Sequence, residues 1–184
     1  MLRKATPKDA QHLAPLLYDA IHEIAYSLTG ASSKQEALLL LAHWIEKPAN
    51  RLSYENIWVE QQGLLPVGLL VSYTGNKAMQ LDLPLQQALR KLNKSDALDV
   101  ETEGNVLYID TLSVHPDYGG QGIGTTLLQK AFEEAKRREV EAVTLNVDLT
   151  NVRARKLYER LGFEELSVRT ISGAAFAYMG KNML

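Results

Sequence analysis

The chain has 184 residues, enough for one domain with its own hydrophobic core, and residues 1–184 are expected to form a single domain. With 20 Lys and Arg against 22 Asp and Glu, the formal net charge is −2, which gives no electrostatic case for a nucleic-acid partner. The absence of cysteine excludes disulfides, cysteine-based metal sites and a thiol nucleophile. The N-terminus lacks the apolar run of a signal peptide, and the apolar cluster at residues 37–42 is too short to span a bilayer. We therefore expect a cytoplasmic protein without a metal or a membrane partner.

The first third of the chain predicts a short strand, two helices and a hairpin. Thr6 followed by Pro7 and Asp9 is typical of a helix start, and apolar residues then recur at helical spacing. Residues 33–36 read Ser-Lys-Gln-Glu, a capping box for a second helix that stops before Pro48. Strands are expected at residues 2–5, 57–60 and 66–73, the last two joined around Gln62-Gly63.

Residues 74–104 are less regular and predict an insertion or lid. A short helix is expected to start near Pro84, because apolar residues follow it at helical spacing. The end of this segment is acidic, with four carboxylates between residues 96 and 103.

The second half of the chain begins with residues 106–114, the clearest strand in the sequence. Strict alternation predicts that Tyr108, Asp110 and Leu112 share one face and that Ile109 and Ser113 lie on the other. A glycine-rich turn and an amphipathic helix follow. The later elements are expected as a strand at 142–147, a helix at 151–161 and strands at 163–171 and 175–180. This order predicts an α/β fold, a mixed sheet with helices on both faces and a right-handed parallel crossover.

The glycine-rich turn Gly119-Gly120-Gln121-Gly122-Ile123-Gly124 carries the strongest functional signal. Glycines let the backbone bend tightly and let a bulky anion approach, and the helix start offers unpaired amides. The alternative is a strand-to-helix turn that binds nothing. A P-loop is excluded because Thr125 stands where a lysine is needed, and the glycine spacing fits the dinucleotide fingerprint poorly.

Two motifs in this half resemble those of the GNAT superfamily of N-acetyltransferases. The glycine turn is similar to the family's pyrophosphate loop, Arg/Gln-x-x-Gly-x-Gly/Ala. Residues 151–163, Asn-Val-Arg-Ala-Arg-Lys-Leu-Tyr-Glu-Arg-Leu-Gly-Phe, are similar to the family's Asn-x-x-Ala-x-x-x-Tyr-x-x-x-Gly-Phe. The resemblance covers about a third of the chain, and it implies a central, mostly antiparallel sheet with one parallel strand pair.

The resemblance also implies a cosubstrate, acetyl-CoA, and the residues that hold it. Asn151 would contact the pantetheine arm, and Tyr158 would protonate the departing thiolate. These two residues are seven positions apart and share one helical face, although Asn151 alone is typical of a helix N-cap and Tyr158 alone of a core aromatic. The pyrophosphate would be held by Gly119, Gly120, Gln121, Gly122, Ile123, Gly124 and Thr125, and the pantetheine amides would pair with the strand edge at Leu112, Ser113 and Val114.

One position departs from the family pattern, because the first Arg/Gln of the loop falls on Gly119. We expect weaker cofactor binding from the loss of that side chain. The glutamate that many family members place on the strand at 106–114 is also absent, and Asp110 is the predicted catalytic base. Alternatively, Asp110 only forms hydrogen bonds at the end of the strand. His115 is a second candidate for the base, and alternatively it is a solvated turn residue.

The predicted function is direct transfer of an acetyl group to a primary amine of a small molecule or peptide. The acidic stretch 96–103 either lines the acceptor entrance, where it favours cationic amines, or is a solvated face. A non-catalytic CoA-binding module and a nucleotide-binding switch are the rival functions. The sequence leaves the oligomeric state open between monomer and homodimer.

Overall fold

The computed structural model describes all residues, 1–184, and contains one seven-stranded sheet with the order β1-β2-β3-β4-β5-β7-β6. Only the β4–β5 pair is parallel, and every other neighbouring pair is antiparallel. This confirms the predicted mixed sheet. The strands are β1 Leu2–Lys4, β2 Ile57–Gln62, β3 Leu65–Thr74, β4 Val106–Val114, β5 Ala142–Asp148, β6 Glu164–Ile171 and β7 Ala174–Asn182.

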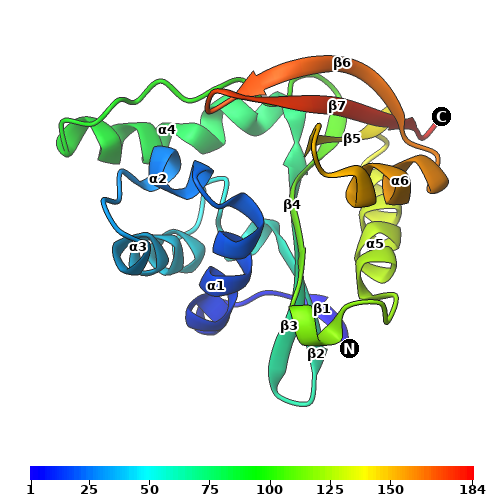
Figure 1. Cartoon of the computed structure of the whole chain (residues 1–184), viewed down its shortest axis with the longest axis horizontal. Helices are drawn as coiled ribbons and strands as arrows, with labels where there is room; N and C mark the ends of the chain where they lie inside the picture. Colours follow the sequence, from blue (N-terminus) through cyan, green and yellow to red (C-terminus); the bar gives the residue numbers. More distant parts are fainter.

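Helices cover both faces of this sheet (Figure 1). Four of them lie on one side: α1 Ala10–Ile21, α2 Ile24–Thr29, α3 Lys34–Glu46 and α4 Ala78–Lys91. The other side carries α5 Ile123–Arg137 and α6 Val152–Arg160. The hairpin of β6 and β7 extends across the end of the sheet toward α2 and α4. None of the helices combines the length and the apolar composition that crossing a bilayer requires.

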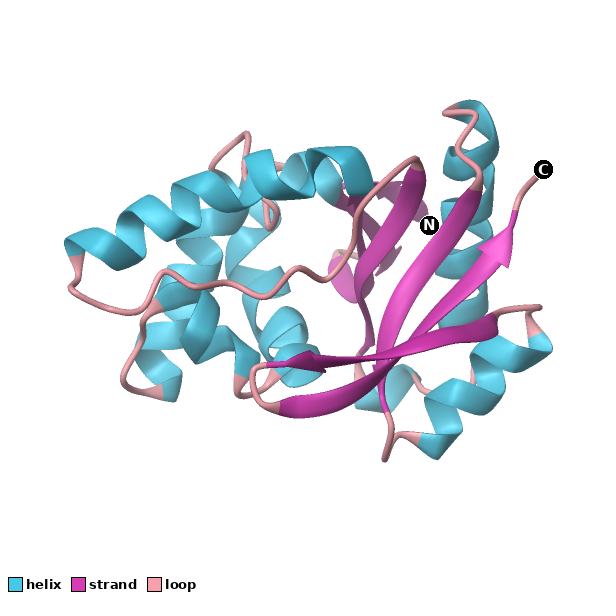
Figure 2. Ribbon diagram, turned by 90° about the horizontal axis from the view of Figure 1, so that it is seen from above, coloured by secondary structure: helices cyan, strands magenta, loops and turns pink.

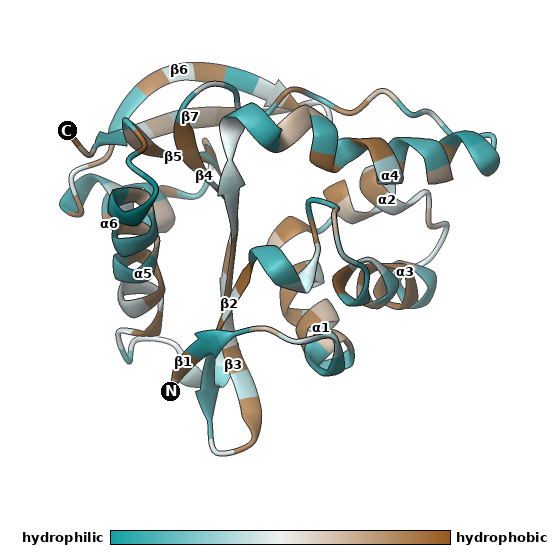
Figure 3. Ribbon diagram, turned by 180° about the vertical axis from the view of Figure 1, so that it is seen from behind, coloured by the Kyte–Doolittle hydropathy of each residue, from teal (hydrophilic) through white to brown (hydrophobic).

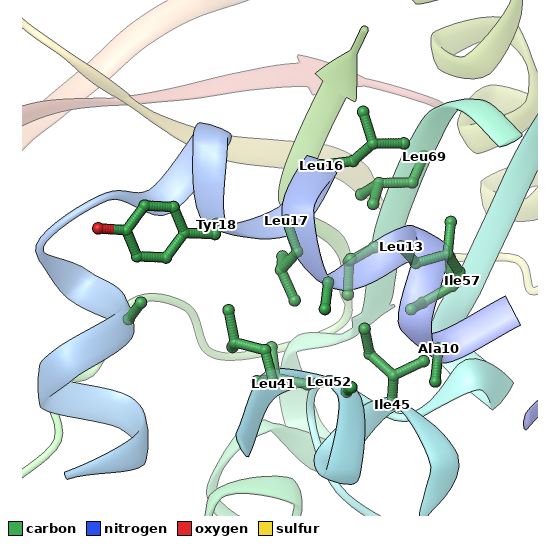
Figure 4. Packing of buried hydrophobic residues seen from close by; sticks show 14 of the residues in the cluster. Ala10, Leu13, Leu16, Leu17, Tyr18, Leu41, Ile45, Leu52, Ile57 and Leu69 are labelled. Carbon is green, nitrogen blue, oxygen red and sulfur yellow. The ribbon is translucent and has the colours of Figure 1, made fainter. Parts of the chain in front are cut away.

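The first core packs α1 between the sheet and α3 (Figure 4). Leu13 and Leu17 of α1 are fully buried, and they meet Leu41 of α3 and Ile57 of β2 in the same cluster. Each such side chain contributes roughly 1.5–3 kcal/mol on burial. The helix expected from Pro7 begins instead as a 3₁₀ turn, Pro7–Asp9, and becomes α-helical at Ala10.

The second core lies under α5 and α6 and includes Leu127, Leu128, Tyr158 and Phe163. Figure 3 shows the hydrophobic colour along β5 and β7 and the hydrophilic colour over much of α5. The amphipathic α5 thus packs its apolar stripe against β4, which precedes it in the chain, and β5, which follows it.

Two sequence predictions about local structure were wrong. The helix expected near Pro84 starts at Ala78, and Pro84 lies inside α4. The preceding residues, Ala78-Met79-Gln80-Leu81, are good helix formers, and they extend the helix upstream of the proline. After α4 the chain runs back to the sheet as an extended loop (Figure 2).

The second correction concerns β4, whose side chains do not alternate strictly. Ile109 pairs with Ser72 and Thr111 pairs with Val71, so Asp110 is an extra residue in a β-bulge. The bulge shifts the alternation by one position. Leu112 therefore packs into the same core as Ile109, which the alternation had placed on the opposite face.

Candidate active site

The parallel pair β4–β5 holds together over only part of its length. Residues 106–109 of β4 pair with residues 142–145 of β5. Beyond that point Asp110 is unpaired in the bulge, residues 111–114 pair only with β3, and residues 146–148 pair only with β7. The sheet therefore splits at Asp110 and Asn146, and β4 keeps a free edge at Leu112, Ser113 and Val114, to which an extended amide chain can pair.

The glycine turn lies at the end of β4 and has a backbone that only glycine adopts without strain. Gly120 has φ +76° and Gly122, the N-cap of α5, has φ +79°. A Cβ atom added at Gly120 or Gly122 meets nothing within 4 Å, and at Gly124 only Val114 at 3.9 Å. The loop thus presents its backbone directly to an approaching ligand.

The amides at this turn are free to donate. The backbone N–H groups of Gly120, Gln121 and Gly122 donate no backbone hydrogen bond. The first backbone hydrogen bond of α5 is donated by the Thr126 N–H to the Gly122 C=O. The N–H groups of Ile123, Gly124 and Thr125 lie in the first turn of α5, where backbone N–H groups have no acceptor within their own helix. Unpaired amides, open space and the positive end of a 15-residue helix together fit a diphosphate. Gly119 stands at the Arg/Gln position of the family's loop and has no side chain that could contact a diphosphate.

Tyr158 of α6 is buried and belongs to the same hydrophobic cluster as Ile109 of β4 and Val147 of β5. Its ring meets Phe163 edge-on at 5.7 Å between centroids. Burial raises the pKa of Tyr158 to about 12, so the hydroxyl stays protonated at neutral pH. Asn151 Oδ1 accepts the Ala154 N–H at 3.1 Å, which confirms its N-cap role.

Asp110, the predicted base, is joined to a buried arginine that the sequence did not single out. Arg51 Nε lies 3.0 Å from Asp110 Oδ2, and the Tyr73 hydroxyl donates to the same oxygen at 2.7 Å. Asp110 Oδ1 accepts only the Thr111 hydroxyl, at 2.9 Å. Arg51 also forms ion pairs with Glu101 at 2.9 Å and Asp82 at 3.4 Å. Burial disfavours the Arg51 charge, but these carboxylates raise the pKa of Arg51 well above its ordinary value.

Glu101, from the acidic stretch, bridges the two strands where they part. It accepts the Tyr108 hydroxyl of β4 at 2.7 Å, and its carbonyl accepts Asn146 Nδ2 of β5 at 3.0 Å. Burial raises the pKa of Tyr108 well above its ordinary value, so its phenol remains a donor. Asn146 Oδ1 is buried and has no partner within the chain, an acceptor that no sequence motif had marked.

The remaining predicted candidates occupy different places. His115 is half exposed and accepts the Asp117 N–H at 3.3 Å, which fits a turn residue. In the acidic stretch, Asp96 forms an exposed ion pair with Arg90, and Asp99 accepts the Ser172 N–H at the tip of the β6–β7 hairpin. Among the carboxylates of this stretch, Glu101 is the one that contacts β4 and β5.

Comparison with known proteins identifies the family and agrees with the fold. The model of the acetyltransferase (GNAT) family matches residues 18–163. The chain belongs to the GNAT family, which consists of acyltransferase enzymes. Over its whole length it superimposes on all of a crystal structure described as an acetyltransferase, with a TM-score of 0.79 and 31% identity. It also superimposes on an N-acetyltransferase from Staphylococcus aureus with a TM-score of 0.84 and 22% identity, covering 98% of this chain and 99% of that one.

The curated relatives match a shorter stretch. An uncharacterized N-acetyltransferase of Methanocaldococcus jannaschii is 48% identical over 63 residues, 34% of this chain and 28% of that protein. The ribosomal protein bS18 alanine N-acetyltransferase of Escherichia coli is 41% identical over 58 residues, 32% of this chain and 39% of that protein. The matched part of the chain thus spans less than two fifths of each of these relatives.

Proposed function

We propose that this chain is an acetyl-CoA-dependent N-acetyltransferase that moves an acetyl group directly to a primary amine of a small molecule or peptide. The observation that carries the proposal is the row of unpaired amides at the open glycine turn before α5, which suits a diphosphate. The unpaired edge of β4 suits a pantetheine arm, and the buried Tyr158 suits a proton donor to a thiolate.

In this proposal the backbone amides at Gly122, Gly124 and Thr125 hold the pyrophosphate, and Gly119, Gly120, Gln121 and Ile123 complete the loop around it. The edge formed by Leu112, Ser113 and Val114 pairs with the pantetheine amides, and Asn151 contacts the same arm. The Val114 N–H at this edge also polarises the thioester carbonyl that the amine attacks. Since Asn151 Oδ1 already caps α6, its side-chain NH₂ group is the part that faces the ligand.

When bound, acetyl-CoA supplies the acetyl thioester. The amine nitrogen forms a bond to the carbonyl carbon, and the carbon–sulfur bond breaks with its electron pair going to sulfur. Tyr158 donates its hydroxyl proton to that sulfur, a role for which its high pKa keeps it protonated. Asp110 takes a proton from the amine through Oδ1, the oxygen that accepts only the Thr111 hydroxyl, directly or through water.

The rival function, a CoA-binding module without catalysis, is favoured by Gly119 and by the absence of a glutamate on β4. The two are separated by measuring thiol release from acetyl-CoA in the presence of a panel of small amines and peptides. The transferase predicts amine-dependent release that the Tyr158→Phe variant slows. A chain that binds CoA and releases no thiol with any amine is the non-catalytic module. The bS18 alanine N-acetyltransferase relative is the reason to include peptides in that panel.

A further inference from the structure

The two oxygens of the Asp110 carboxylate are held very unevenly by their neighbours. Oδ2 accepts three hydrogen bonds, from Arg51 Nε at 3.0 Å, Arg51 Nη2 at 2.5 Å and the Tyr73 hydroxyl at 2.7 Å. Oδ1 accepts only the Thr111 hydroxyl, at 2.9 Å. Because a carboxylate has about four lone-pair sites shared between its oxygens, Oδ2 is fully occupied and Oδ1 can accept a further hydrogen bond.

This arrangement differs from the usual geometry of an arginine beside a carboxylate. The guanidinium fork ordinarily gives one N–H to each oxygen, since two parallel hydrogen bonds match its planar shape. Here both contacts from Arg51 go to Oδ2. Rotation about the Cβ–Cγ bond of Asp110 would bring Oδ1 to the same fork and occupy it. The Tyr73 hydroxyl is the remaining donor to Oδ2, and its hydrogen bond opposes that rotation.

Tyr73 is itself fixed by its place in β3. The residue is 3% exposed, it pairs with Tyr108 of β4, and the two rings meet edge-on at 5.6 Å between centroids. Asp110 is the extra residue of the bulge in β4, and a bulge can re-aim a side chain, here toward the Tyr73 hydroxyl. Burial raises the pKa of Tyr73 well above its ordinary value, against the charge of Arg51, so the hydroxyl keeps its proton and acts as a donor.

We propose that Tyr73 is a positioning residue for acetyl transfer: its hydroxyl, together with Arg51, holds Oδ2 of Asp110 and leaves Oδ1 open to the acceptor amine. This inference rests on the proposed transferase function, with Asp110 as the base. The amine proton goes to Oδ1, while the Tyr73 proton stays on its own oxygen. Tyr73 therefore acts through Asp110 and does not itself contact the amine.

The neighbouring Tyr108 provides a matched control. It is also buried, and its hydroxyl donates at the same distance, 2.7 Å, to Glu101 rather than to Asp110. The Tyr108 hydroxyl also accepts from Asn146 Nδ2 at 3.1 Å, so its removal should cost stability at least as much as removal of the Tyr73 hydroxyl. Tyr73→Phe and Tyr108→Phe thus each remove one hydroxyl that donates to a carboxylate, and only Tyr73→Phe removes it from the base.

The test is steady-state kinetics of thiol release from acetyl-CoA, with whichever amine of the panel the wild type acetylates fastest. Tyr73→Phe should lower kcat about tenfold, with the KM for the amine and the calorimetric affinity for CoA within about twofold of the wild-type values. Tyr108→Phe should keep kcat within about twofold. Melting temperatures are measured first, to show that both variants are folded at the assay temperature.

A double variant separates positioning of the base from a general structural effect. If Tyr73 acts through Asp110, adding Tyr73→Phe to Asp110→Asn should lower kcat by a further factor of less than about two, because the base is already absent. A Tyr73 that only stabilises the fold would lower activity by the same factor in both backgrounds.

The proposal is overturned if Tyr73→Phe keeps the wild-type kcat, if the two tyrosine variants lose equal activity, or if the loss is undiminished in Asp110→Asn. A Tyr73→Phe chain that is unfolded at the assay temperature while Tyr108→Phe is folded would make Tyr73 a structural residue and would also contradict the proposal. Failure of the proposed function is distinguishable, since it is seen in the wild type alone. A wild type that binds CoA but releases no thiol with any amine would contradict the transferase, and with it the base that Tyr73 positions.

Discussion

Arg51 Nε lies 3.0 Å from Asp110 Oδ2, although the two residues are 59 positions apart in the chain. The arginine side chain is 2% exposed and the aspartate side chain 4%, so this is a buried ion pair. Removing one partner of such a pair leaves an uncompensated charge in the interior. Asp110 is thus held at the bulge by a contact between two distant parts of the sequence.

The first prediction follows from this pair. Arg51→Met should destabilise the fold by about 3–5 kcal/mol, because Asp82, Glu101 and Asp110 lose their common cation. Equilibrium unfolding in urea measures the effect. Arg90→Met, which breaks the exposed pair with Asp96, is the comparison and should leave the free energy of unfolding nearly unchanged. Equal losses in the two variants would contradict the buried network.

A second prediction concerns Asp110 as the base. Asp110→Asn keeps the shape of the side chain but removes both its capacity to accept a proton from the amine and the charge that pairs with Arg51, so the melting temperature of the variant is measured first to show that it is folded at the assay temperature. We expect kcat/KM to fall about 100-fold, with CoA affinity unchanged within about twofold, because the base acts on the acceptor and not on the cofactor. Steady-state kinetics measures kcat/KM, and calorimetry measures the affinity for CoA. Full activity in this variant would exclude Asp110 as the base and leave it as the anchor of Arg51.

The third prediction concerns Tyr158. Tyr158→Phe should lower kcat about 100-fold and leave the affinity for CoA nearly unchanged. Since the pKa of Tyr158 is about 12, its proton is present across the usual assay range, and no loss of activity below about pH 11 should arise from it. A basic limb near pH 10 that disappears in Tyr158→Phe would show that the residue titrates at its ordinary value.

A fourth prediction uses Asp82, whose pKa burial raises from 3.8 to about 6, against the opposing charge of Arg51 and with support from Asp110 and Glu101. The folded and unfolded chains both carry the proton on Asp82 below about pH 3, and above that pH the unfolded chain ionises first. Asp82 therefore costs stability as the pH rises from about 3 to 6, of order 1–3 kcal/mol in all. Asp82→Asn should stabilise the fold at pH 7 by part of that amount, measured by thermal denaturation. The gain should vanish near about pH 3, and a destabilisation at pH 7 would contradict the shift.

The sequence predicted the features that are local in the chain. The glycine turn, the N-cap at Asn151 and the amphipathic α5 each depend on neighbouring residues, whose spacing is visible directly. The split between β4 and β5 and the bulge at Asp110 were invisible, because they depend on pairing with β3 and β7. Arg51 was missed for the same reason: it lies in a loop without a motif, and its partners come from α4, β4 and the segment between them.

The most direct test of the account is CoA binding to a matched pair of glycine variants. Gly122→Ala places a methyl group in the path of the diphosphate at φ +79°, whereas Gly63→Ala introduces similar strain at φ +59° in the β2–β3 turn, far along the chain from the α5 turn. Calorimetry should show CoA binding to the wild type, the same affinity in Gly63→Ala and a loss of about tenfold or more in Gly122→Ala. Absence of CoA binding to the wild type, or equal affinity in both variants, would contradict the claim that the amides at the start of α5 hold the diphosphate.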